Sequence, residues 1–139
     1  MSVRRTMLDT NVLSELLRPD ADSRVVAFVE AQTEPIVSAV VFHELIYGVE
    51  LLPSGARRAR LNAGVETLRR QFRDHTVGVD AEIAGIAGRL RAGETRSGFA
   101  LRAMDALIAA CAISASARLA TRNVRDFERL DIELVNPWE

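Results

Sequence analysis

The sequence has a single cysteine, no lysine and no long apolar segment. One cysteine cannot form an intrachain disulfide, which excludes the class of small disulfide-rich secreted proteins. The longest uncharged stretch in the last third, residues 106–117, has 12 residues, fewer than the roughly 20 that a membrane helix needs. Arg4 and Arg5 precede only the two apolar residues Met7 and Leu8, too short a run for a signal peptide. We therefore expect a cytoplasmic protein with no membrane segment.

The 139 residues have the length of about one domain, with an ordinary hydrophobic content of 48% and a net charge of −1. A nucleic-acid partner would therefore have to bind a local basic patch. All 18 basic residues are arginines. A GC-rich coding sequence would explain this preference, so it does not require a functional reason. Residues 53–79 contain six of them against two acids. This basic segment is either a guide for RNA, a solvated helix face or a docking surface for another protein. Its arginines are Arg57, Arg58, Arg60, Arg69, Arg70 and Arg73.

Short apolar segments alternate with longer helical patterns, which predicts an α/β protein with a mostly parallel sheet. Strands are expected at residues 7–8, 36–37, 76–79, 119–121 and 132–135. Helices are expected at residues 10–17, 25–29, 39–52 and 56–73, then after Asp80, at 102–116 and as a turn at 124–129. The glycine-flanked segment 93–98 is predicted to be a polar loop.

Asp105 lies on an apolar helix stripe, where an unpaired carboxylate is unexpected. Its neighbours one and two turns away are Leu101, Ile108, Ala109 and Ala112. A buried carboxylate without a partner costs several kcal/mol, so it should be protonated, paired with an arginine or bound to a metal. Pairing with a nearby arginine, or a place near the helix start, is the simpler interpretation.

Glu44 and Asp9 raise the same question less strongly. Glu44 has mostly apolar helical neighbours, and Gly48 one turn later would leave open space beside its carboxylate. Taken alone, a glutamate at the boundary of a helix surface is the simpler interpretation. Asp9 directly follows the first expected strand, where an aspartate often caps a helix.

These acids follow different strands, so they can converge at one edge of the sheet. Ligands of open α/β sheets bind beyond the carboxyl ends of the strands. Carboxylates that cannot all ionise close together are stable around a cation, and an all-oxygen ligand set favours Mg²⁺ or Mn²⁺ over Zn²⁺. Such an ion, single or paired, would serve the hydrolysis of a phosphodiester.

Four ordered segments resemble the PIN-domain family, in particular the bacterial ribonuclease toxins of the VapC and FitB type from type II toxin–antitoxin modules. The segments are residues 7–15 (MLDTNVLSE), 38–45 (SAVVFHEL), 104–109 (MDALIA) and 120–127 (ATRNVRDF), with the ending NPW at 136–138. Each is weak by itself, but the ordered set is specific and covers essentially the whole chain.

The resemblance implies a three-layer α/β/α sandwich formed by one PIN-like domain over residues 1–139. It implies a Mg²⁺-dependent endoribonuclease that hydrolyses RNA and is neutralised by a cognate antitoxin, as a homodimer or a larger complex with it. Two other functions fit the same residues. One is a regulatory or binding protein with a weak metal site, and the other is a metal-dependent nucleotide phosphatase.

The resemblance also assigns roles to individual residues. Asp9 and Asp105 would be the principal metal-binding acids, and Glu44 would complete the metal site by orienting a water molecule or binding a second ion. Some members have a fourth aspartate where this chain has Asn123, with Asp126 three residues later. Either residue can then be the fourth catalytic position. Thr121 is placed to hydrogen-bond one of the carboxylates.

Overall fold

The structure, a computed structural model, describes residues 4–139 and contains a five-stranded sheet flanked by helices. Its strands are β1 (Arg5–Leu8), β2 (Glu34–Ser38), β3 (Thr76–Val77), β4 (Arg118–Ala120) and β5 (Leu134–Val135). Its helices are α1 (Thr10–Leu16), α2 (Ser23–Glu30), α3 (Ala39–Glu50), α4 (Ala56–Gln71), the 3₁₀ turn η1 (Arg73–His75), α5 (Ala81–Arg96), α6 (Ala103–Ser114) and α7 (Val124–Phe127). The strand order is β3-β2-β1-β4-β5 and every neighbouring pair is parallel. The predicted parallel α/β fold is confirmed.

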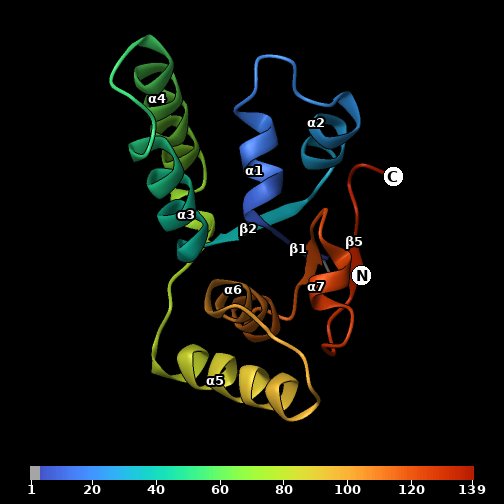
Figure 1. Cartoon of the computed structure of the whole chain (residues 1–139). Coiled ribbons are helices and arrows are strands. Elements are labelled where there is room, and N and C mark those ends of the chain that lie inside the picture. The colour runs from blue at the N-terminus through green and yellow to red at the C-terminus, as the bar shows by residue number, and fades with distance from the viewer. Residues whose placement is uncertain (1–3) are drawn as a thin grey trace.

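Helices cover both faces of the sheet (Figure 1). Helices α1 and α2 lie on one face, α5 and α6 lie on the other, and α3 with α4 stands beside β2. This is the three-layer arrangement that the resemblance implied. Among residues 4–139, no helix has both the length and the apolar character required to cross a bilayer.

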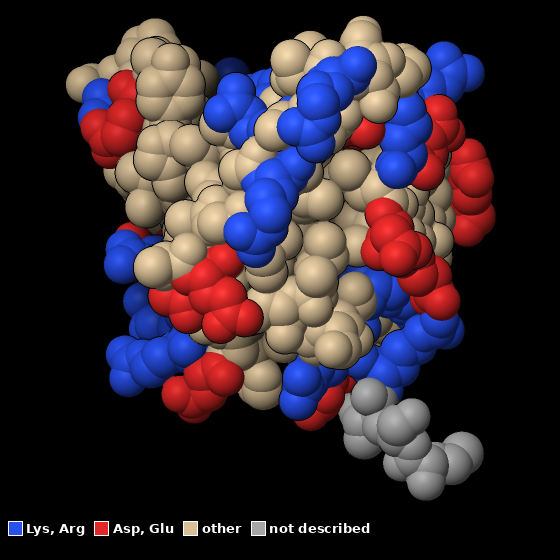
Figure 2. All heavy atoms as spheres, turned by 90° about the horizontal axis from the view of Figure 1, so that it is seen from below, with Lys and Arg blue, Asp and Glu red and all other residues tan. Residues whose placement is uncertain are grey.

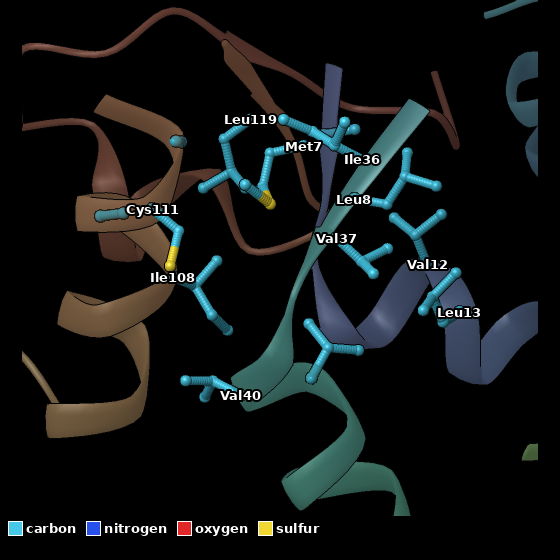
Figure 3. Packing of buried hydrophobic residues seen from close by; sticks show 14 of the residues in the cluster. Met7, Leu8, Val12, Leu13, Ile36, Val37, Val40, Ile108, Cys111 and Leu119 are labelled. Carbon is cyan, nitrogen blue, oxygen red and sulfur yellow. The ribbon is translucent and has the colours of Figure 1, made fainter. Parts of the chain in front are cut away.

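The central strand β1 is buried on both faces, as expected for a parallel sheet covered by helices. Successive side chains of a strand point to opposite faces, so Met7 points toward Cys111 of α6 and Leu8 toward Val12 of α1 (Figure 3). All four residues are fully buried. This core fixes where β1 ends, and therefore where Asp9 begins the next turn.

The predicted polar loop at residues 93–98 is wrong, because α5 continues through Arg96. The reason is a long-range contact. The side chain of Glu94 is buried, and its Oε2 accepts a hydrogen bond of 2.8 Å from Nε of Arg129. A partner 35 residues away thus holds the last turn of the helix, and Gly93 does not interrupt it, whereas Gly98 lies beyond the end of the helix.

The other differences concern the ends of elements. Val79, expected in the third strand, lies outside β3 and is exposed, and the last strand covers only Leu134–Val135 of residues 132–135. The basic helix ends at Gln71, and η1 connects it to β3.

Candidate active site

The four predicted acids come from four segments that meet at the carboxyl edge of the sheet. Asp9 follows β1 directly, and Glu44 lies on α3, which begins where β2 ends. Asp105 lies in the first turn of α6, which leads back to the start of β4, and Asp126 lies on α7 after β4. The parallel topology therefore brings together side chains that are far apart in the sequence.

Asp9 is both a helix cap and a buried carboxylate. Its Oδ1 accepts a hydrogen bond of 2.8 Å from the backbone amide of Thr10, and its Oδ2 accepts one of 2.7 Å from the hydroxyl of Thr121. The predicted hydrogen bond between Thr121 and a carboxylate is thereby confirmed. Burial raises the pKa of Asp9, and the two hydrogen bonds oppose this shift without cancelling it. The negative charges of Glu44 and Asp126 raise the pKa further.

Glu44 is held toward α1 by one hydrogen bond. The hydroxyl of Thr10 donates to its Oε1 at 2.6 Å, which is short, as expected for a hydroxyl donating to a carboxylate. Gly48 has open space where a Cβ would lie, as the sequence predicted. Glu44 is thus a half-buried acid at the wall of a groove, and its position depends on α1 as well as on its own helix.

Asp105 has the largest pKa shift among these acids. Its pKa is raised from 3.8 to about 6, first by burial and then by the charge of Asp9, while the charge of Arg102 opposes the shift. The eight ion pairs formed within residues 4–139 do not include Asp105, so pairing with an arginine does not hold. The other part of the simpler interpretation, a place near the helix start, is confirmed, because Asp105 lies in the first turn of α6. Asp126 and Glu44 also raise its pKa.

Asp126 and Asn123 differ in how they act on the other acids of the site. The charge of Asp126 raises the pKa of both Asp9 and Asp105, although its side chain is exposed. Asn123 is also exposed, and its described contact to the site is made by its backbone amide, which donates to the hydroxyl of Thr121 at 3.0 Å. Asp126 lies inside α7 and does not cap it.

This donor set is suited to Mg²⁺. It contains only carboxylate oxygens, and the charges of Glu44 and Asp126 raise the pKa of both Asp9 and Asp105, so a cation would relieve this repulsion. Within residues 4–139, no three carboxylate, histidine or cysteine side chains are already spaced to surround one ion. Mg²⁺ does not require such a cage, because it keeps several water ligands and binds one or two carboxylates directly. Asp9 and Asp105 fit the direct ligands, and Glu44 and Asp126 fit contacts through water.

The raised pKa of Asp105 predicts how the stability of the metal-free protein depends on pH. The folded state binds the proton more tightly than the unfolded state, so the free energy of unfolding should fall as the pH rises from about 4 to about 6. The expected loss is about 1–2 kcal/mol after allowance for solvent screening. Urea unfolding in EDTA across this range measures it.

Asp105→Asn is the control for this pH dependence, because its amide does not titrate. Subtracting the curve of the variant from that of the wild type removes the contribution of all other acids. A difference that stays constant between pH 4 and pH 6 would contradict the assignment of the shift to Asp105.

A groove of about 650 Å³ opens beside Glu44, between α1, α3 and α4. Thr10 and Glu44 lie on its wall, with Arg57 and Arg60 of α4 across it. A larger hollow of about 740 Å³ lies at the opposite, amino edge of the sheet, far from the acids in the topology. The groove that adjoins the acids is therefore the smaller of the two.

Thr10 is a further site residue, which the sequence places only at the start of an expected helix. The signal was present, since a hydroxyl directly after a candidate ligand can reach a second carboxylate. It was not decisive, because the contact to Glu44 spans 34 residues and depends on how α1 packs against α3.

Comparisons with known proteins agree with this geometry. The family described as PIN domain matches residues 6–133. Toxin FitB of Neisseria gonorrhoeae is 34% identical over 135 residues, covering 95% of this chain and 97% of FitB. The VapC ribonuclease Y4jK of Sinorhizobium fredii is 31% identical over 136 residues, covering 96% of this chain and 97% of Y4jK. A solved structure of FitAB bound to an IR36 DNA fragment superposes with a TM-score of 0.87 at 33% identity, covering 96% of both chains.

Proposed function

Because the chain belongs to the PIN-domain family, among toxins of the VapC and FitB type, we propose that it is a Mg²⁺-dependent endoribonuclease and the toxin of a type II toxin–antitoxin module. The observation that carries the proposal is the coupling of Asp105 to Asp9, Asp126 and Glu44 at one edge of the sheet. The relative Y4jK is a ribonuclease by name, and its similarity extends over nearly the whole chain.

In the proposed mechanism, Asp9 and Asp105 hold the metal and Glu44 handles a proton. When bound, Mg²⁺ would lower the pKa of a water molecule and offset negative charge that develops on the phosphate. Thr121 and the amide of Thr10 fix the orientation of the Asp9 carboxylate. The hydroxyl of Thr10 holds Oε1 of Glu44, which leaves Oε2 to orient the attacking water and accept its proton.

A cognate antitoxin is the proposed protein partner. Its support is the likeness to the FitAB complex bound to DNA, in which the similar chain is crystallised with a partner. We propose that this chain acts as a homodimer or in a larger complex with its antitoxin.

The direct test is incubation of the purified protein with structured RNA or with mononucleotides, each in Mg²⁺ or in EDTA. We expect cleavage of RNA in Mg²⁺ and none in EDTA, with restoration by added Mg²⁺ or Mn²⁺. Release of phosphate from mononucleotides without RNA cleavage would support the phosphatase alternative. Mg²⁺ binding without any turnover would support the regulatory alternative.

The fourth site position can be assigned by comparing Asp126→Ala with Asn123→Ala. We expect Asp126→Ala to slow cleavage at least about tenfold and weaken the dependence on Mg²⁺, because its charge reaches Asp9 and Asp105. Asn123→Ala should stay within about threefold of wild type, because its described contact is a backbone amide that alanine keeps. Cleavage rates across a Mg²⁺ titration provide the measurement, and the opposite ranking would assign the position to Asn123.

A further inference from the structure

A polyanion that reaches the acidic site must be held by basic side chains elsewhere on the protein. The net charge of the protein is −1, and four of its carboxylates lie together at the site, at one edge of the sheet. Seven of the arginines already form ion pairs with acids among residues 4–139. In the basic segment 53–79 two of the six arginines are neutralised in this way, because Arg58 pairs with Glu50 and Arg69 with Glu66. Arg57 and Arg60 of this segment line the groove beside Glu44.

Helix α5 and the start of α6 carry a group of arginines that remain available. Arg89, Arg91 and Arg96 on α5 and Arg102 before α6 are all exposed, and none takes part in an ion pair within the described residues. One acid, Glu94, lies between them in the sequence, but it is buried and paired with Arg129. Figure 2 shows a diagonal band of basic side chains across the face of the molecule on which α5 lies. We call Arg89, Arg91, Arg96 and Arg102 the α5 arginine track.

The α5 arginine track is connected to the site. Nε of Arg91 donates a hydrogen bond of 3.2 Å to the backbone oxygen of Leu101, which directly precedes Arg102. The charge of Arg102 in turn acts on Asp105, three residues later. The track therefore begins beside a proposed metal ligand and extends away from it along α5.

The spacing and the side-chain chemistry favour a nucleic-acid strand. Arg89 and Arg96 are two helical turns apart, or about 10 Å along the axis, which is too far for one phosphate to bridge. A strand with several phosphates can contact both, and the guanidinium group binds phosphate through two parallel hydrogen bonds. Phe99 lies between Arg96 and Arg102 and is 45% exposed, although the guanidinium of Arg129 lies over its ring. Its exposed part adds an aromatic surface on which a base can stack.

We propose that the α5 arginine track binds the RNA backbone beside the scissile phosphate and so determines on which side of the site the substrate lies. This inference rests on the proposed ribonuclease function. The track does not stand out in the sequence, because residues 80–139 contain eight arginines against nine acids, which hides a local excess of positive charge.

The test compares two triple substitutions in an Asp105→Asn background that does not cleave. One is Arg89→Gln, Arg91→Gln and Arg96→Gln on α5. The matched control is Arg69→Gln, Arg70→Gln and Arg73→Gln, which removes the same charge from α4 and η1. The double variant Arg89→Gln with Arg96→Gln keeps the hydrogen bond from Arg91 to Leu101. It therefore shows whether an effect of the triple variant comes from a change in the connection between α5 and α6.

The probe is a labelled single-stranded RNA of about 20 nucleotides, and fluorescence anisotropy measures its Kd at several salt concentrations. The α5 triple variant should raise the Kd at least about tenfold at 0.1 M salt and reduce the salt slope by about 2, since each lost phosphate contact contributes about 0.7. The control should change the Kd less than about twofold. With Asp105 restored, the α5 substitutions should raise KM while kcat stays within about twofold.

Equal weakening by both triple variants would overturn the track, because the effect would then follow total charge alone. An unchanged RNA affinity with altered sedimentation would overturn it as well and identify the face as a protein interface. If the wild type cleaves RNA but KM does not respond to the α5 substitutions, only the track fails. If the wild type neither binds nor cleaves RNA in Mg²⁺, the proposed function itself fails.

Discussion

Asp105→Asn is expected to lower the rate of RNA cleavage at least about a hundredfold while the protein remains folded. The carboxylate is a proposed direct ligand of the metal, and its pKa is raised to about 6 by burial and by Asp9. Asparagine has nearly the same shape but no charge, so the metal loses both a ligand and the negative potential that attracts it. Cleavage of RNA at saturating Mg²⁺ and Mg²⁺ binding by calorimetry are the two measurements.

The same substitution should increase stability when no metal is present. At pH 7 the ionised Asp105 is repelled by Asp9, Asp126 and Glu44, and the amide removes this repulsion. The midpoint of thermal unfolding in EDTA should therefore rise, whereas in Mg²⁺ the wild type should gain more than the variant. Loss of activity together with higher metal-free stability distinguishes a functional acid from a structural one.

Asp20→Asn is the matched control for this experiment. It makes the same chemical change at an acid whose side chain is 77% exposed and which lies outside the four-acid site. Cleavage by this variant should equal that of the wild type. Full activity of Asp105→Asn would remove Asp105 from the mechanism.

Arg129→Ala is expected to have the largest effect on stability, a loss of about 2–4 kcal/mol in the free energy of unfolding. The guanidinium donates to the buried Glu94 at 2.8 Å and lies over the ring of Phe99 at 3.7 Å. Alanine would leave the Glu94 carboxylate desolvated without a partner and would uncover the ring. Urea unfolding at pH 7 measures the change.

Two further variants test whether the buried carboxylate is the cause. Arg24→Ala removes an exposed ion pair of the same length, with Asp22 at 2.8 Å, and should lose less than about 1 kcal/mol. Adding Glu94→Gln to Arg129→Ala should recover part of the loss, because a neutral amide is easier to bury than a charge. Equal losses for Arg24→Ala and Arg129→Ala would contradict this account.

The order of elements and the parallel sheet could be predicted because they depend on local patterns. Runs such as Met7–Leu8 and Ile36–Val37, each followed by a capping residue, specify a buried strand and then a helix. The end of α5 could not be predicted in this way. Gly93 is locally unfavourable for a helix, and the contact between Glu94 and Arg129, which helps to hold this turn, joins residues that are far apart in the sequence.

The anomalous acids can be identified from their neighbours in the sequence. Asp105 on an apolar stripe and Asp9 at a strand end are unusual through their immediate neighbours, so their candidacy needed no coordinates. The motif around Asn123 and Asp126 left the fourth position open, because spacing alone does not say whose charge reaches the other acids.

How these acids interact depends on the distances that the folded chain creates between them. The pKa of Asp105 depends on burial and on charges from three other segments. The hydroxyl that holds Asp9 comes from Thr121, directly after β4, and the one that holds Glu44 comes from α1. Desolvation and Coulomb energies vary with distance in space, and residues 34 or 112 positions apart acquire such a distance only when the sheet forms.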